Sequence, residues 1–161
     1  KPVRHTPILR RFNMAATAWQ IYNKAKLNLG NGTIKLGVDN FKMFLTRTTS
    51  NVSTLTLSTF ASVTGEISAT GGYTAGGRAL VPAVGQWVVG SAANKYKFTI
   101  STVGLAFTAS GASLTNIRNA GIQNSAGKLL CYCQLSSAQF TVASPNTLTV
   151  LPAGAGIFTL T

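Results

Sequence analysis

The clearest pattern of hydrophobic and polar positions lies near the end of the chain. Within residues 128–135 two sets of side chains alternate: Leu129, Cys131, Cys133 and Leu135 in one set, and Leu130, Tyr132 and Gln134 in the other. A period of two is typical of a β-strand, because successive side chains point to opposite faces. Residues 124–127, Asn-Ser-Ala-Gly, are typical of a turn. The pattern therefore predicts a hairpin of residues 114–123 and 128–135.

Similar short runs, separated by glycine, proline and serine, recur along most of the chain. They predict strands in residues 33–36, 41–48, 79–81, 86–90, 95–101, 103–108, 139–143, 147–151 and 156–161. Short strands at this spacing are typical of sandwiches and barrels. We therefore expect a mainly β protein, with a single β-sandwich or β-barrel-like domain over residues 15–161.

One segment near the start, residues 17–30, has a helical pattern instead. Its apolar residues share one helical face: Ala18, Ile21, Tyr22, Ala25 and Leu29. Thr17 can cap this helix, and the Gly-Asn-Gly at residues 30–32 can end it. Such a helix either covers one side of a β-sheet or docks onto a partner. A second, short helix is expected near residues 54–62, although the many threonines there oppose it.

Residues 1–14 carry two prolines and the basic residues Lys1, Arg4, Arg10 and Arg11. They should be extended and lack a core of their own. This segment is either a tail without fixed structure or a basic arm that lies on a partner. Met14 begins a stretch that is typical of an ordinary N-terminus, so residues 1–13 are either an encoded arm or an extension.

The charge of the chain is strongly positive. Fourteen lysines and arginines oppose only Asp39 and Glu66, which gives a net charge of +12, and nine of the fourteen lie within the first 47 residues. Such a charge favours an acidic partner, which can be a nucleic acid, an acidic membrane or an acidic protein surface. No run of 18 apolar residues is present, so we expect no membrane-spanning helix.

The side chains that catalysis requires are few and scattered. General acid–base chemistry needs paired titratable groups, but Asp39 lies in a predicted turn and the only histidine, His5, has no neighbouring carboxylate. Cys131 and Cys133 share one face of a strand, roughly 6.5–7 Å apart, which opposes a disulfide between them and indicates two core thiols. We therefore expect no catalytic site, no metal and no cofactor.

Two further patterns allow other interpretations. Residues 71–78, Gly-Gly-Tyr-Thr-Ala-Gly-Gly-Arg, resemble a phosphate-binding loop only in composition, because they lack its Gly-Lys-Ser/Thr ending. Aromatic and basic residues are interleaved at residues 95–98 and 41–42, as in grooves that bind single-stranded nucleic acid. Simple strand alternation, with the aromatic residues in the core and the lysines in solvent, explains the same pattern.

Several segments resemble a family of small virion proteins of tailed bacteriophages, the capsid decoration or cement proteins. The matching segments occur in the same order as in the family: Trp19–Lys26, Leu29–Gly32, Ile34–Leu36, Phe41–Leu45, Gly71–Gly77, Lys128–Cys133 and Gly154–Thr161. They are packing and turn signatures, and none is a catalytic motif. The basic arm and the excess of positive charge lie outside this resemblance.

The resemblance implies a non-enzymatic protein that binds the outside of a phage capsid in the virion and stabilises it by bridging major capsid protein subunits. It also implies a homo-oligomer, with a trimer as the usual arrangement. The residues expected to contact the capsid are Arg4, Arg10, Arg11, Trp19 and Tyr22. Two alternatives stay open: a structural protein of the tail, tail tip or fibre, and a basic nucleic-acid-binding module.

Overall fold

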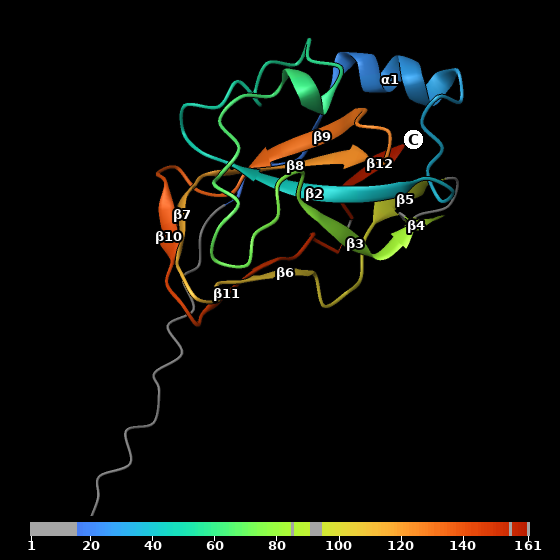
Figure 1. Ribbon diagram of the computed structural model, residues 1–161. Helices are drawn as coiled ribbons and strands as arrows, with labels where there is room; N and C mark the ends of the chain where they lie inside the picture. Colours follow the sequence, from blue (N-terminus) through green and yellow to red (C-terminus); the bar gives the residue numbers. More distant parts are fainter. Residues whose placement is uncertain (1–15, 85, 91–94, 155, 161) are drawn as a thin grey trace, which may run out of the picture.

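The computed structural model describes residues 16–84, 86–90, 95–154 and 156–160. The predicted basic arm, residues 1–14, lies outside this range. In the described part the chain is mainly β, with one α-helix near its start and one turn of 3-10 helix (Figure 1). The expected fold class, mainly β with an N-terminal helix, is thus confirmed.

The body is organised around a five-stranded antiparallel sheet with the strand order β1-β9-β8-β2-β3. In that order the strands are Gln20–Ile21, Leu129–Gln134, Asn119–Asn124, Asn40–Thr46 and Arg78–Val84. The predicted hairpin is β8 and β9, and its two strands pair from Asn119 opposite Gln134 to Gln123 opposite Leu129. The hairpin therefore lies in the middle of the sheet, between β1 and β2.

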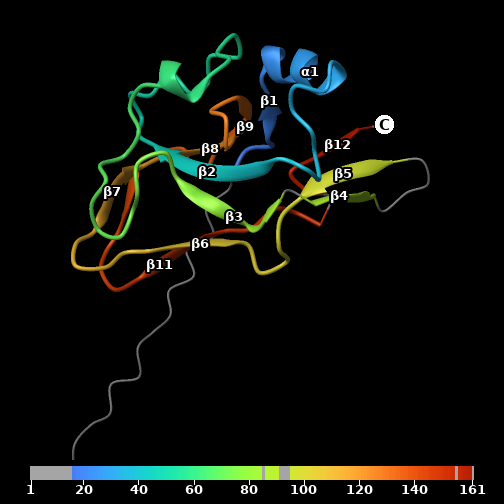
Figure 2. The same cartoon turned by 45° about the vertical axis from the view of Figure 1, so that its right-hand side comes forward.

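Both faces of this central sheet are covered. Helix α1 (Asn23–Gly30) and the 3-10 turn η1 (Phe60–Ser62) lie over one face, β6 (Leu105–Thr108) and β11 (Thr147–Val150) lie on the other side, and the remaining small sheets lie towards the two ends (Figures 1 and 2). Phe44 of β2 packs edge-on against Phe60 on the first side, with ring centroids 4.9 Å apart. Phe41 packs against Phe98 on the second side, at 5.1 Å. Alternation along β2 thus sends large side chains into two separate packed layers.

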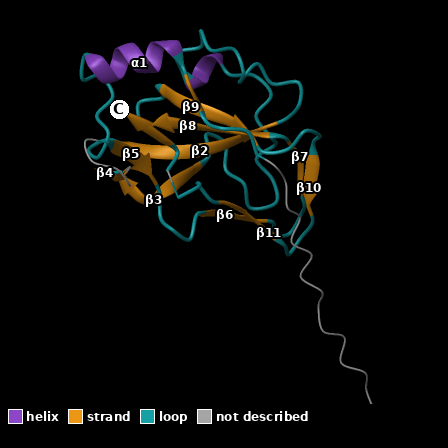
Figure 3. Ribbon diagram, turned by 180° about the vertical axis from the view of Figure 1, so that it is seen from behind, coloured by secondary structure: helices purple, strands orange, loops and turns teal. Residues whose placement is uncertain are grey.

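Three smaller antiparallel sheets complete the body (Figure 3). The largest contains β12 (Phe158–Leu160), β5 (Tyr96–Thr99) and β4 (Gln86–Val89), in that order. The other two pair β11 with β6, and β10 (Phe140–Val142) with β7 (Leu114–Ile117). The strands predicted for residues 79–161 are present with ends that differ by a few residues, except that the predicted strand of residues 114–123 is divided into β7 and β8, which belong to different sheets.

Two glycines allow elements to approach one another closely. Gly77 has a φ of +86° and precedes β3; a Cβ atom there would collide with the carbonyl group of Met43 in β2. Gly121 of β8 lies under the ring of Phe44, and a Cβ atom there would collide with that ring. These two contacts bring β3 and the Phe44 ring against the backbone of the central sheet.

The predicted start of the helix at Thr17 is wrong, because α1 begins at Asn23. The Thr17 N–H donates to the Gln134 carbonyl at 2.8 Å, and the Thr17 hydroxyl accepts from the Gln134 N–H at 3.0 Å. Residues 20–21 then pair with β9 as β1. The edge of β9 therefore holds residues 17–21 extended, and the helix starts only beyond it. Its end at Gly30 agrees with the prediction.

Residues 33–36 do not form the predicted strand. They belong to turns that Asp39 closes: the Lys35 N–H donates to Asp39 Oδ2 at 3.2 Å, and the Asp39 N–H donates to the Lys35 carbonyl at 2.9 Å. The short helix expected near residues 54–62 is confined to η1. The reason is that the preceding backbone bonds to the β8–β9 hairpin, through Phe60 N–H to the Gly127 carbonyl and Leu129 N–H to the Ser58 carbonyl.

Candidate functional site

The residues expected to contact a partner fall into three groups. Arg4, Arg10 and Arg11 lie outside the described residues. Trp19 is partly buried against the core. Tyr22 is fully buried, and its hydroxyl donates to the Val52 carbonyl at 2.6 Å. Tyr22 therefore belongs to the core of the folded chain, and we leave it out of the contact residues proposed below.

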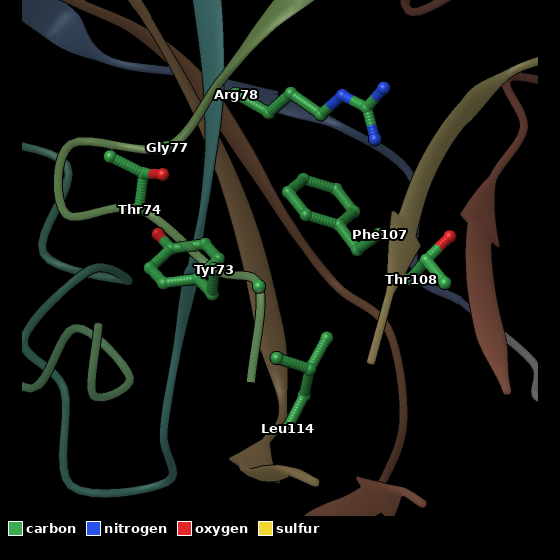
Figure 4. A pocket seen from close by; sticks show the side chains of 8 residues that line it. Tyr73, Thr74, Gly77, Arg78, Phe107, Thr108 and Leu114 are labelled. Carbon is green, nitrogen blue, oxygen red and sulfur yellow. The ribbon is translucent and has the colours of Figure 1, made fainter. Parts of the chain in front are cut away.

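The glycine-rich segment forms one wall of a small pocket (Figure 4). The pocket has a volume of about 240 Å³ and is lined by Gly72, Tyr73, Thr74, Gly77, Arg78, Phe107, Thr108 and Leu114. The rings of Tyr73 and Phe107 lie 6.1 Å apart, and Arg78 donates to the Ala106 carbonyl at 2.5 Å. Small-molecule sites in proteins measure about 300–1,000 Å³. This pocket therefore has room for a single side chain of a partner rather than for a nucleotide.

Three backbone N–H groups of this segment are already engaged within the chain. Tyr73 N–H donates to the Thr70 carbonyl at 3.1 Å, Gly76 N–H to Glu66 Oε1 at 2.8 Å, and Gly77 N–H to the Thr74 carbonyl at 3.0 Å. A phosphate cradle needs several such N–H groups to point at the ligand. The segment is therefore a structural turn before β3, as its missing Gly-Lys-Ser/Thr ending indicates.

Both side-chain carboxylates hold loops in place. Glu66 Oε1 accepts from the Tyr73 hydroxyl at 2.6 Å, and the same hydroxyl accepts from the Leu45 N–H at 3.0 Å. Burial, together with the hydrogen bond to Glu66, raises the pKa of Tyr73. Asp39 Oδ2 accepts from the side-chain amide of Asn124 at 3.0 Å as well as from Lys35 N–H. Neutral donors therefore occupy both carboxylates of the chain.

The positive charges, by contrast, are mostly at the surface. Ten of the fourteen basic residues lie in the described part, and six of these are exposed: Lys24, Lys26, Lys35, Lys42, Arg78 and Lys95. Arg47 and Arg118 are partly buried, and the Nε atom of each is buried without a hydrogen-bond partner among the described residues. Because ten positive side chains oppose only two negative ones in the described part, its surface can attract an acidic partner.

The interleaved aromatic and basic residues separate to opposite sides of their strands. Phe41 and Phe98 are fully buried, whereas Lys42 is exposed. Tyr96 is 48% exposed and stacks on Trp87, with ring centroids 5.7 Å apart and an interplanar angle of 19°. The lysines at 95 and 97 alternate with Tyr96, so they point to the other face. Alternation explains this pattern better than a groove that combines stacking with positive charge.

The two cysteines are buried, unpaired core thiols, as the sequence predicts. Burial raises the pKa of Cys133 to about 12 and also raises that of Cys131. Both thiols are therefore protonated near neutral pH, and a protonated buried thiol is a poor nucleophile. Within residues 16–84, 86–90, 95–154 and 156–160, no three His, Cys, Asp or Glu side chains gather closely enough to bind a metal ion.

The structure reveals an apolar surface that the sequence interpretation missed. Val88 and Val89 of β4 are 38% and 65% exposed, and Leu151 nearby is 60% exposed. Val88, Lys97 and Leu151 line a shallow hollow of about 380 Å³. The run Trp-Val-Val at residues 87–89 was a signal, because a strand that is apolar on both faces needs cover on both. The sequence does not indicate, however, that β4 is an edge strand.

No helix in the described part of the chain is both long and apolar enough to cross a lipid bilayer. Comparisons with protein-family models, with curated proteins and with solved structures find no match for this chain. The fold and its surface thus define a basic, mainly β protein with a packed central sheet and an exposed apolar strand.

Proposed function

We propose that this chain is a non-enzymatic structural protein of a tailed-bacteriophage virion. It binds the outside of the capsid and stabilises it by bridging major capsid protein subunits. The observation that carries this proposal is where the segments of the family resemblance lie. Trp19–Lys26 includes β1 and the start of α1, Phe41–Leu45 lies within β2, and Lys128–Cys133 includes most of β9. The resemblance therefore concerns the central sheet, which is the body of the fold.

The charge distribution supports a protein partner with an acidic surface. Both carboxylates are engaged by internal hydrogen bonds, while lysines on α1 and around the body remain exposed. Complementary charges at an interface mainly speed association and set the orientation of the partners. Apolar contacts from exposed strands supply the burial that holds the complex together.

The contact residues that we propose are Arg4, Arg10 and Arg11, with Trp19 at the junction of the arm and the body. Arginine pairs with carboxylates through two parallel hydrogen bonds, which makes it suited to fixing the register of an extended arm on a capsid subunit. Trp19 is only partly buried, so part of its ring is available to a partner at the same end.

Deletion of residues 1–11 tests the role of the arm. Purified heads that lack the protein are incubated with the full chain or with the deleted chain, and occupancy is measured by quantitative gel analysis across a range of salt concentrations. We expect the deletion to weaken binding and to flatten its salt dependence, because four positive charges are lost. Equal occupancy of both chains would contradict a role of the arm.

Two further experiments separate the remaining interpretations. Cryo-electron microscopy of complete virions that shows the protein only at the tail would replace the capsid assignment with a tail or fibre protein. Filter binding of a single-stranded oligonucleotide, repeated across salt, tests the nucleic-acid alternative. The placement of Tyr96 and Lys97 on opposite faces of β5 makes that alternative the less supported one.

A further inference from the structure

We propose that the open edge of β4 is a docking site for an extended, acidic strand of a partner protein. The added strand would become the fourth strand of the sheet β12-β5-β4. This inference deepens the proposed function and rests on it in one respect, since the expected partner is a capsid subunit. The edge geometry, the exposed apolar side chains and the local charge each support it.

The hydrogen bonding of β4 shows which groups face the open edge. β4 is the last strand in its sheet, and its Val88 lies opposite Lys97 of β5. The Gly90 N–H donates to the Lys95 carbonyl at 2.7 Å. In an antiparallel pair every second residue of a strand bonds to the neighbouring strand, so Val88, two positions before Gly90, also bonds to β5. The N–H and C=O groups of Trp87 and Val89 therefore point away from β5, towards an edge along which no described strand lies.

A contact on the far side of β5 agrees with this alternation. Phe98 lies opposite Trp87, so the rule places its backbone groups on the side away from β4. The Phe98 carbonyl indeed accepts from the Ile157 N–H at 2.8 Å, next to β12. The outward direction of the Trp87 and Val89 backbone groups is thus fixed by bonds on both sides of β5.

The side chains of β4 do not protect this edge. Exposed edge strands usually carry a lysine, a proline or a bulge that prevents pairing with other chains. β4 consists of Gln-Trp-Val-Val and has none of these, whereas β3 contains Pro82. Val88 and Val89 point to opposite faces and are both exposed, and Tyr96 beside Val89 is half exposed. An added strand would therefore cover apolar side chains on both faces of the sheet.

The charge near the edge selects an acidic occupant. Lys97 shares a face with Val88, and Lys95 precedes β5 on that same face. Neither Asp39 nor Glu66 lies on β4 or β5. A second copy of this chain would bring the same +12 charge to the edge, and like charges across strands are destabilising. The expected strand alternates carboxylates, on the lysine side, with apolar residues on the side of Val89 and Tyr96.

The substitution Val89→Pro tests this edge selectively. Proline removes the outward N–H of residue 89 but leaves the bonds of Val88 and Gly90 to β5, and proline is tolerated at such edge positions. Val89→Thr is the matched control, because it keeps the N–H and the β-branched shape. With purified heads that lack the protein, we expect Val89→Pro to weaken binding about tenfold and Val89→Thr to weaken it less than about threefold. Equal binding of wild type and Val89→Pro would overturn edge docking and leave the proposed function standing.

Circular dichroism establishes whether Val89→Pro folds. If it does not, hydrogen exchange of the wild-type chain on heads replaces the variant: slower exchange in residues 86–90 on binding supports the docking site, and unchanged exchange overturns it.

A peptide experiment tests the edge without the capsid. The probe is a synthetic peptide of eight alternating valine and glutamate residues, with an alternating valine and lysine peptide as control, and the readout is the amide NMR spectrum. We expect the acidic peptide alone to shift the Trp87 and Val89 amide signals. Absence of this shift overturns the inference even if heads bind. The inference is also overturned if sedimentation shows that the chain self-associates and the same two amide signals shift with protein concentration. A larger shift of these signals with a single-stranded oligonucleotide overturns it as well. If wild type fails to bind heads while the peptide still shifts these amides, only the proposed function is overturned.

Discussion

The central sheet and the β12-β5-β4 sheet are built from similar alternating sequences but have different surroundings. In the central sheet, Leu130 and Cys131 of β9 point to opposite faces and both are fully buried. In the smaller sheet, Val88 and Val89 of β4 also point to opposite faces, yet both are exposed. The difference arises from cover: β9 lies between two strands and under α1, whereas β4 has a single described neighbour.

This difference implies that the central sheet serves mainly stability and that the exposed residues of β4 serve mainly binding. Complete burial of an apolar side chain contributes about 1.5–3 kcal/mol, so the buried side chains of β2, β8 and β9 contribute strongly to stability. The exposed residues of β4 gain little from folding but would gain from burial by a partner. Substitutions in the two sheets should therefore have opposite consequences, large for stability in the first and large for binding in the second.

The largest contrast is expected between Phe44→Ala and Val89→Ala. Phe44 is fully buried between Gly121 and Phe60, and its loss should lower the free energy of unfolding by about 3–5 kcal/mol. Val89 is 65% exposed, so its truncation should cost less than about 0.5 kcal/mol. Urea unfolding followed by tryptophan fluorescence measures both values. Similar losses for the two variants would break the comparison.

A smaller loss of stability, which tests a single contact, is expected for Gly121→Ala. The added methyl group would meet the Phe44 ring, and overpacking of this kind costs about 1–3 kcal/mol. Gly154→Ala is the matched control, because a Cβ atom at that position meets nothing within 4 Å. Thermal unfolding of both variants gives the comparison. A stable Gly121→Ala protein would mean that the ring of Phe44 can move aside, and that this layer is less tightly packed than described.

The smallest effect concerns the thiols of β9. Burial raises the pKa of Cys133 to about 12, from an ordinary value near 9, so the unfolded chain loses this proton at a lower pH than the folded chain. The free energy of unfolding should therefore fall as the pH rises above about 9, by about 1 kcal/mol from Cys133 at pH 10. Cys133→Val, which cannot titrate, should show a shallower decline in urea unfolding at pH 8 and pH 10.

A labelling experiment provides the control for burial. Ellman's reagent at pH 8 should leave Cys131 and Cys133 unmodified until urea unfolds the chain. An added thiol on the open edge, in Val89→Cys, should react at once because the valine there is 65% exposed. Rapid labelling of the native cysteines would show that the central sheet opens locally.

Much of the strand content was predictable because alternation is a local property. The hairpin of β8 and β9 followed from a period of two around the turn at residues 124–127. Alternation does not reveal whether a face is covered, however, so it could not show that both faces of β9 are buried. The edge position of β4 escaped prediction for the same reason, because it depends on the strand order of the folded chain.

The errors near the start of the chain have a related cause. The residues before Asn23 fit a helical pattern, but Gln20 and Ile21 form backbone bonds with Tyr132 and Cys131, more than a hundred positions away. Tyr22, on the apolar face of the predicted helix, was expected to contact a partner, but it is buried because it packs against Tyr132 of β9 and bonds to Val52. The sequence pattern of a short segment does not predict contacts with residues this far away in the chain.

The strand order also determines when the central sheet can assemble during synthesis. β2 ends at Thr46, but its neighbour β8 begins only at Asn119, and β9, which pairs with β1, ends at Gln134. A chain emerging from the ribosome at about 5–20 residues per second exposes the apolar β2 for several seconds before β8 arrives. β3 can pair with one edge of β2 once Val84 has emerged, but the edge that pairs with β8 stays open until later, and it is this edge that a chaperone would need to shield in the meantime.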